Sequence, residues 1–211
     1  MLVKPLLAAS GLLLFADCAL AQTQTQLSVA ECDASPGKYI DMGFMEFDQT
    51  MDGGWRVIAR KKGCELVAAD LIAVYREKAL DRAYSLDWHE AQVRAHAGQT
   101  DKALELFRRN LAYEKARPVE HRSDSNILKA EATVAFFERD LDKLRAARAE
   151  LAALPKPPGY DDGIAKFKQR YPDLTPPTWR LNLDILDGFI RCFDMPYSEA
   201  TECRKDEPGA R

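Results

Sequence analysis

Apolar residues recur at steps of three and four along most of the chain, which is the spacing of one face of an α-helix. The pattern begins near Phe44 and runs to about residue 154. Its apolar positions are Trp55, Ile58 and Ala59; Leu66, Ala69, Ile72, Ala73 and Leu80; Trp88, Ala91 and Ala95; Ala103, Leu106, Phe107 and Leu111; Ile127, Ala130, Val134 and Phe137; and Leu141, Leu144, Ala147 and Leu151. The intervening residues are helix formers, and we find no run of alternating β-branched residues. The sequence therefore predicts an all-α fold.

Irregular segments flank this helical block (44–154). Residues 22–43 are polar and carry the turn sequence Ser35-Pro36-Gly37. Several prolines end the block and open a Pro-rich insertion at 155–178, which has room for a short helix through Ile164, Phe167 and Tyr171. A last helix is expected from about Trp179 to Phe193, within a C-terminal segment (179–211) that carries two cysteines.

The start of the chain has the three parts of a secretory signal peptide. Lys4 supplies a positive charge, an apolar stretch follows, and Ala19-Leu20-Ala21 fits the small-x-small rule for signal peptidase. We therefore expect residues 1–21 to be removed by cleavage after Ala21, and the protein to be periplasmic or secreted. The alternative is a lipoprotein acylated at Cys18, but Asp17 stands where that modification requires a small residue.

Charge and hydropathy limit the partners. The chain has 30 basic and 33 acidic residues, a formal net charge of −3, and no basic block. Nucleic acid and anionic membrane surfaces are therefore poor partners. No segment after the signal peptide is long and apolar enough to span a membrane, which needs roughly 20 residues. Arginines such as Arg76 and Arg109 alternate with acidic residues, a pattern that predicts a solvated helix surface.

Four cysteines remain after the signal peptide, and in an exported protein they suggest two disulfides. Three pairings are possible, and we favour the pairing local in sequence, Cys32–Cys64 with Cys192–Cys203. A zinc site or a redox site would prefer close C-x-x-C pairs, which the sequence lacks. We expect structural bridges, with no metal and no cofactor.

No catalytic motif stands up to inspection. His89-Glu90 begins like H-E-x-x-H, but Val93 replaces the second histidine. Three acids, Glu46, Asp48 and Asp52, precede Gly53-Gly54 without the spacing of a calcium loop, so a capping or turn role is expected of them. The sequence has neither a G-x-S-x-G elbow nor a glycine-rich phosphate loop. An envelope hydrolase using these acids is kept only as an alternative.

One short pattern recurs where one helix gives way to the next. Gly63 and Gly98 lie 35 residues apart, and each is followed by an alanine five residues on and a large apolar residue four further. Arg139, 41 residues after Gly98, takes the glycine position of a third copy. Glycine permits a tight turn, alanine lets two helices approach closely, and the large residue fills the space between hairpins.

This pattern resembles the tetratricopeptide repeat family, with Trp88 to Phe107 as its best copy. The resemblance implies stacked antiparallel helical hairpins in a right-handed array. The chain departs from the family in its uneven spacing, in Arg139, and in a late proline, Pro118. An irregular helical bundle is the alternative fold.

The resemblance also implies a concave groove lined by the first helix of each hairpin. The groove positions would be Arg60, Lys61, Trp88, Gln92, His96, Lys129 and Thr133. A tryptophan beside amide, imidazole and cationic groups suits a peptide. We therefore expect a non-catalytic module that binds a protein or peptide of the cell envelope, with a small-ligand-binding bundle as a further alternative.

Overall fold

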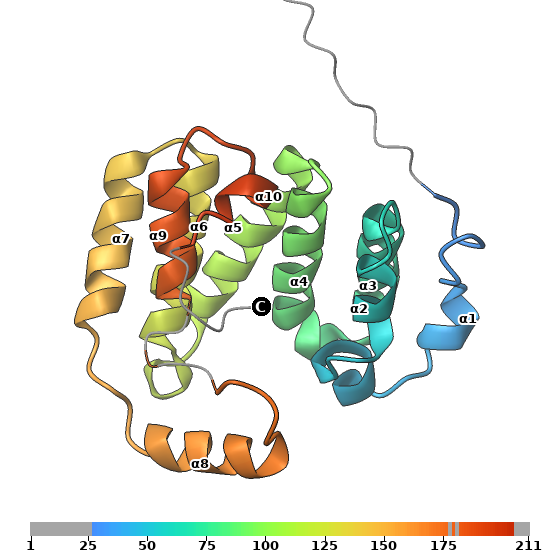
Figure 1. The fold of residues 1–211 in the computed structure, drawn as a ribbon, viewed down its shortest axis with the longest axis horizontal. Coiled ribbons are helices and arrows are strands. Elements are labelled where there is room, and N and C mark those ends of the chain that lie inside the picture. The colour runs from blue at the N-terminus through green and yellow to red at the C-terminus, as the bar shows by residue number, and fades with distance from the viewer. Residues whose placement is uncertain (1–26, 177–178, 180–181, 205–211) are drawn as a thin grey trace, which may run out of the picture.

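The computed structural model describes residues 27–176, 179 and 182–204 (Figure 1). Its helices are α1 (Pro36–Tyr39), α2 (Gly54–Ala59), α3 (Glu65–Lys78), α4 (Ala83–His96), α5 (Thr100–Ala116), α6 (Asp124–Phe137), α7 (Leu141–Ala153), α8 (Tyr160–Arg170), α9 (Leu183–Arg191) and α10 (Tyr197–Ala200). A π-helical turn spans Met45–Gln49, and 3-10 turns span Leu80–Arg82 and Val119–His121. These residues contain no strand, so the predicted all-α fold is confirmed. The expected signal peptide and Cys18 lie outside the described residues.

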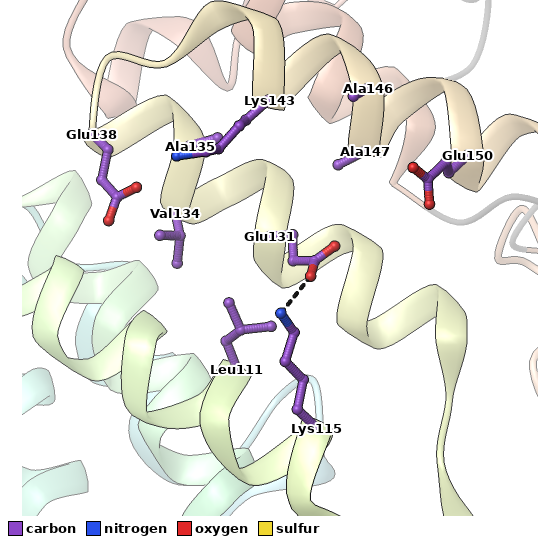
Figure 2. Close-up of a pocket in the computed structure, with 10 residues that line it drawn as sticks. All are labelled: Leu111, Lys115, Glu131, Val134, Ala135, Glu138, Lys143, Ala146, Ala147 and Glu150. Atoms are coloured by element: carbon purple, nitrogen blue, oxygen red, sulfur yellow. Dashed lines mark ion pairs between the residues drawn. The ribbon is translucent and has the colours of Figure 1, made fainter. Parts of the chain in front are cut away.

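Each long helix packs against the next along the chain, from α2 through to α7. Helix α6 lies between α5 and α7, as the labelled Leu111, Val134 and Ala147 show (Figure 2). The C-terminal elements then return to the earlier helices: α9 packs on α7 and α6, and α10 packs on α4. Helix α8 lies apart at the lower edge of Figure 1 and buries none of its residues.

Two of the turns between helices have the same backbone geometry. Gly98 ends α4 with φ +79° and Arg139 ends α6 with φ +59°, both in the left-handed region. In the first turn Gln99 N donates to Arg94 O at 2.8 Å, and in the second Asp140 N donates to Ala135 O at 2.9 Å. These bonds satisfy carbonyls at the helix C-terminus and form a Schellman motif in each turn. Arg139 therefore adopts the backbone conformation of the glycine that it replaces in the pattern.

The buried apolar residues form two clusters that meet at α4. One lies between the N-terminal segment, α2, α3 and one face of α4, and contains Phe47, Ile58 and Ile72. The other lies between the opposite face of α4, α5–α7, α9 and α10, and contains Phe107 and Phe136. Burying each such side chain stabilises the fold by about 2–3 kcal/mol.

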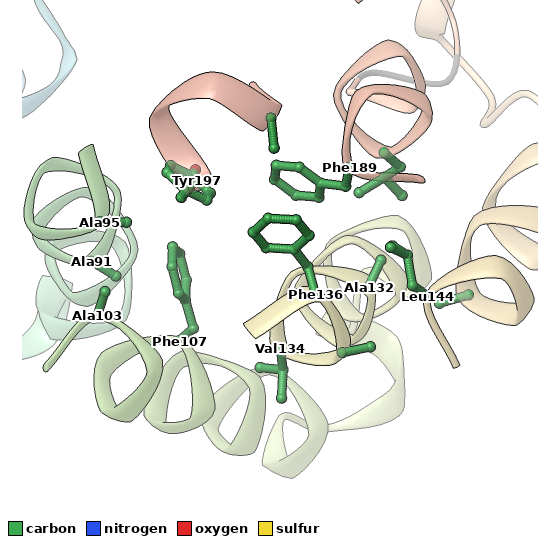
Figure 3. Packing of buried hydrophobic residues seen from close by; sticks show 14 of the residues in the cluster. Ala91, Ala95, Ala103, Phe107, Ala132, Val134, Phe136, Leu144, Phe189 and Tyr197 are labelled. Atoms are coloured by element: carbon green, nitrogen blue, oxygen red, sulfur yellow. The ribbon is translucent and has the colours of Figure 1, made fainter. Parts of the chain in front are cut away.

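Figure 3 shows how the C-terminal segment completes the second cluster. Phe136 of α6 stacks on Phe189 of α9 with ring centres 4.6 Å apart. Tyr197 of α10 lies 5.4 Å from the Phe137 ring and 5.5 Å from the Phe189 ring. Alanines at the crossing of α4 and α5, among them Ala91 and Ala103, are fully buried and let the two helices approach closely.

The two expected cysteine pairs lie at disulfide distance. Cys32 and Cys64 have Cα atoms 5.7 Å apart and join the N-terminal segment to the start of α3. Cys192 and Cys203, with Cα atoms 6.3 Å apart, close the segment that contains α10. Two such pairs fit an oxidising compartment outside the cytoplasm. Within the part of the chain that the structure describes, no helix has the length and apolarity needed to cross a bilayer.

The ends of two elements differ from the sequence expectation. The last helix begins at Leu183 rather than near Trp179, because Asn182 has φ +67°, which an α-helix cannot contain. The helical pattern from Phe44 is interrupted at Thr50 and resumes at Gly54. Gly54 has φ +55°, and a Cβ there would lie 1.8 Å from the Phe47 carbonyl oxygen, so only glycine fits this close approach.

Candidate functional site

The structure divides the expected groove positions among several environments. Trp88 and Lys129 line one pocket together, whereas Gln92 and His96 line another hollow beside Trp55. Thr133 is buried, and its hydroxyl donates to the carbonyl oxygen of Lys129 at 2.9 Å. Its side chain therefore does not face a groove.

Arg60 and Lys61 are exposed at the end of α2 and do not line that pocket. The Arg60 guanidinium lies 3.7 Å from the Asp52 carboxylate, and Lys61 Nζ donates to the carbonyl oxygen of Cys32 at 3.0 Å. Lys61 thus holds the N-terminal segment next to its disulfide.

The C-terminal segment packs on α4 at His96, which lines the second of these hollows. Tyr197 packs edge-on against the His96 ring, with centres 5.0 Å apart, and its hydroxyl is hydrogen-bonded to Gln92. Burial raises the pKa of Tyr197 to about 12. Because α10 covers this part of α4, the chain itself occupies the middle of the surface that was expected to hold a peptide.

The pocket that contains Trp88, here called the Trp88 pocket, is a polar cavity of about 250 Å³ between α4, α5 and α6. It is lined by Gln49, Tyr84, Ser85, Trp88, His89, Asn110, Glu114, Asn126 and Lys129. Spacings of three or four residues place the members of each helix on neighbouring positions of its surface. Polar side chains thus converge from three helices and from the π-helical turn.

Lys129 has an unusual environment in this pocket. Its Nζ lies 4.3 Å from the centre of the Trp88 ring, which is a cation–π contact. Burial lowers the pKa of Lys129, and the attraction of Glu114 opposes that shift only in part. Among the described residues, Nζ has no hydrogen-bond acceptor and no carboxylate at ion-pair distance. The ammonium therefore faces the pocket, where Nζ stays accessible to solvent.

At the base of the pocket, Asp48 and His89 form a hydrogen-bonded pair. Asp48 is fully buried, and its Oδ1 lies 2.7 Å from His89 Nδ1. Three other donors complete the contacts of this carboxylate: Trp55 Nε1 at 3.0 Å, Gln49 Nε2 at 2.6 Å and Ser85 Oγ at 3.2 Å. Every one of these side chains donates to the carboxylate, as an ionised acid requires.

These contacts fix the state of both members of the pair. Burial alone would raise the pKa of Asp48, but the hydrogen bonds from His89, Trp55 and Gln49 outweigh burial and lower it below its usual value. An ionised carboxylate can only accept, so the proton of a neutral His89 lies on Nδ1. The other ring nitrogen, Nε2, is then an acceptor, and His89 lines the Trp88 pocket.

Sequence reasoning did not find this pair. Asp48 and His89 are 41 residues apart, and neither belongs to a local motif. The capping role expected of the three acids is wrong for Asp48, because the residue that caps α2 is Gly53 and Asp48 points into the core. Glu46 and Asp52 are both exposed and do not join it. In the part of the chain that is described, no group of three or more metal-binding side chains is assembled.

A second pocket, of about 390 Å³, lies between α5, α6 and α7 (Figure 2). Its floor is apolar, and its rim is charged. Both of its lysines are already partnered, because Lys115 pairs with Glu131 at 2.6 Å and Lys143 with Asp140 at 2.8 Å, and Glu138 pairs with Arg108. The Trp88 pocket is the better candidate site, because its lysine has no such partner.

A cluster of buried charges lies between α3, α4 and α5. Glu90 and Arg94 are buried and joined at 2.7 Å, and Asp87 is buried beside Arg109. Arg76, expected on a solvated surface, instead pairs with Asp87 and Glu90 in this cluster. These charges satisfy one another, so the cluster joins the helices and leaves no group for a ligand.

Comparisons with models of protein families, with curated proteins and with solved structures gave no match to this chain. The functional argument therefore depends on the geometry of the Trp88 pocket, and the resemblance to tetratricopeptide repeats stays a prediction.

Proposed function

We propose that the protein is an exported interaction module of the cell envelope, periplasmic or secreted, that binds a segment of another protein at the Trp88 pocket. Its helices would form tetratricopeptide-like hairpins, a reading supported by the left-handed turns at Gly63, Gly98 and Arg139. The observation that carries the proposal is the Lys129 ammonium, seated over Trp88 without a hydrogen-bond acceptor among the described residues.

The environment of the Lys129 ammonium favours the binding of a ligand. Partial burial disfavours the charged form of Lys129, and the cation–π contact of about 1–2 kcal/mol offsets this only in part. A carboxylate or carbonyl of a ligand could replace the water at Nζ with a charge-assisted hydrogen bond. Trp88 adds a large aromatic surface, and residues of this type dominate binding energies at protein interfaces.

The test is capture of partners from envelope extracts by the purified protein and by variants of equal stability. Lys129→Gln keeps a polar side chain of similar length and is expected to reduce partner recovery about tenfold, which corresponds to 1.4 kcal/mol. Trp88→Ala is expected to do the same, although its ring also packs on Phe107 at 5.0 Å, so folding must be checked by circular dichroism.

Lys143→Gln is the matched control, because Lys143 lines the second pocket and is paired with Asp140. This variant is expected to recover partners as well as the unaltered protein does. Equal recovery by all the variants would contradict the proposal. Loss of recovery in Lys143→Gln alone would assign binding to the pocket between α5, α6 and α7 instead.

A further inference from the structure

We propose that the Trp88 pocket also has a hydrolytic activity, in which His89 acts as a general base on water that attacks a short-chain carboxylic ester. This activity goes beyond binding and does not require the ligand to be a protein. The sequence contains no catalytic motif and left a hydrolase using Glu46, Asp48 and Asp52 only as an alternative, without His89. The orientation of His89, the groups around it and the size of the cavity support this activity.

The first step is the orientation of the imidazole. The buried Asp48 carboxylate accepts from His89 Nδ1 at 2.7 Å, which holds the ring and leaves the lone pair of Nε2 as the available base. A carboxylate in this position also stabilises the imidazolium that forms when Nε2 takes a proton. Asp48 does not contact the substrate, so it is a positioning residue, and His89 is the catalytic residue.

The second step identifies the nucleophile. Ser85 lies one turn before His89 on α4, but its hydroxyl donates to Asp48 Oδ2 at 3.2 Å rather than to the imidazole. Its oxygen is therefore not activated by His89. Water is the remaining nucleophile, and the pocket is polar enough to hold it.

The third step concerns the charge that develops on the substrate. Attack by water on an ester carbonyl places a negative charge on the carbonyl oxygen, which needs donors nearby. Lys129 offers an ammonium without a hydrogen-bond acceptor among the described residues, and the side-chain amide of Asn126 lines the same cavity. The Glu114 carboxylate, which would oppose this charge, lies 3.4 Å from the Arg117 guanidinium that neutralises it.

The reaction balances without any other reactant. Nε2 of His89 takes one proton from water as the oxygen of water bonds to the carbonyl carbon. The tetrahedral intermediate then expels the alkoxy group, the carbon–oxygen bond of the ester breaks, and the imidazolium returns its proton to the leaving oxygen. The products are a carboxylic acid and an alcohol. A cavity of about 250 Å³ admits an acetyl or similarly short acyl group.

The test is hydrolysis of p-nitrophenyl acetate by the full-length protein, compared with free imidazole at the same molar concentration. General-base catalysis in an oriented site typically contributes 10²–10⁴-fold, so we expect saturable hydrolysis at least about 100-fold faster than with imidazole. His89→Gln is expected to lose at least about tenfold of this rate, and so is Lys129→Gln. His121→Gln, at an exposed histidine outside the pocket, is the matched control and is expected to leave the rate unchanged.

The pH profile separates a positioning role of Asp48 from a structural one. The titratable groups facing His89 are Asp48 from the π-helical turn, Tyr84 from α4, Glu114 from α5 and Lys129 from α6. The rate is expected to rise with pH, because only an unprotonated Nε2 can accept a proton from water. Asp48→Asn removes the negative partner, so it is expected to move the inflection of this rise to lower pH and to lower kcat. Loss of folded protein alone would lower the rate without moving the inflection.

Three outcomes would overturn this proposal: a rate equal to that of free imidazole, a rate that does not saturate, or an unchanged rate in a His89→Gln variant whose folding circular dichroism has verified. Its failure differs from failure of the proposed binding function. A partner captured through Lys129 without ester hydrolysis overturns only the activity. Hydrolysis through His89 without a captured partner overturns only the binding function.

Discussion

Gly98 and Arg139 hold the same left-handed backbone conformation at the ends of α4 and α6, and each is followed by a residue whose N–H closes the same six-residue hydrogen-bonded turn. A Cβ in this conformation costs about 1–2 kcal/mol. The side-chain contacts of Arg139 offset part of this strain. Its guanidinium donates to the carbonyl oxygen of Phe193 and lies 5.4 Å from the Phe136 ring, so it fastens the end of α9 to α6.

We therefore predict different effects for two substitutions at position 139. Arg139→Ala loses the side-chain contacts and keeps the strain, whereas Arg139→Gly loses the same contacts and removes the strain. The glycine variant should be more stable than the alanine variant by about 1 kcal/mol. Urea unfolding monitored by circular dichroism measures this difference.

Gly98→Ala is the control for the backbone contribution, because a Cβ at Gly98 would meet nothing within 4 Å. Its expected cost is about 1 kcal/mol, equal to the difference between the two Arg139 variants. If Arg139→Gly were instead no more stable than Arg139→Ala, the strain argument would not hold at this turn.

Replacing Lys129 with methionine is predicted to stabilise the protein. The substitution keeps the contact with Trp88 and removes an ammonium whose enclosure lacks a matching acceptor, so we expect a gain of about 1 kcal/mol at neutral pH. Thermal unfolding measures it. The same substitution at Lys143, which is 71% exposed and paired with Asp140, should not stabilise the fold.

The pH dependence of that gain follows from the direction of the Lys129 pKa shift. Burial lowers the pKa in the folded state below the ordinary 10.5, so the folded protein releases its proton before the unfolded chain does. The unaltered protein therefore becomes more stable as the pH rises from the folded pKa towards 10.5. The advantage of Lys129→Met should shrink over the same range, and an advantage constant with pH would contradict the assignment.

The lowered pKa of Asp48 makes the stability of the fold depend on pH in the acid range. Its pKa in the folded state lies below the ordinary 3.8, so its ionised form stabilises the fold above that value. This contribution is lost as the pH falls through the folded pKa. Asp48→Asn should therefore be less stable than the unaltered protein at neutral pH, and the difference should narrow below about pH 4. Unfolding midpoints in urea from pH 7 to pH 3 test the sign; a difference that widened on acidification would refute it.

Tyr197 joins the C-terminal segment to four phenylalanine rings, so its truncation should be severe. Tyr197→Ala leaves a cavity among Phe107, Phe136, Phe137 and Phe189, and we expect a loss of about 3–5 kcal/mol. Tyr197→Phe removes only the hydrogen bond with Gln92 and should cost about 1 kcal/mol. Comparison of the two in urea unfolding separates packing from the polar contact. Equal losses would mean that the hydroxyl, rather than the ring, holds α10 in place.

Local patterns in the sequence were sufficient to predict the helices of the block 44–154. The cysteine spacing indicated the two pairs that lie at disulfide distance. The turns between helices could also be predicted from the sequence, because the repeated pattern aligned Arg139 with Gly98, and the two residues have the same backbone conformation. The packing of α10 on α4 could not be predicted from the sequence, since nothing in residues 197–200 indicates which distant helix they contact. The pairing of Asp48 with His89 has the same cause: it depends on how the π-helical turn packs on α4, which a one-dimensional pattern does not contain.

The return of α9 and α10 has a consequence for how the chain matures. Phe107 and Phe136 find their last aromatic neighbours, Phe189 and Tyr197, only near the C-terminal end of the sequence. A chain that emerges N-terminus first from a ribosome therefore carries α4–α7 with an incomplete core until residues 189–197 appear. Cooperative folding of this cluster has to wait for that segment.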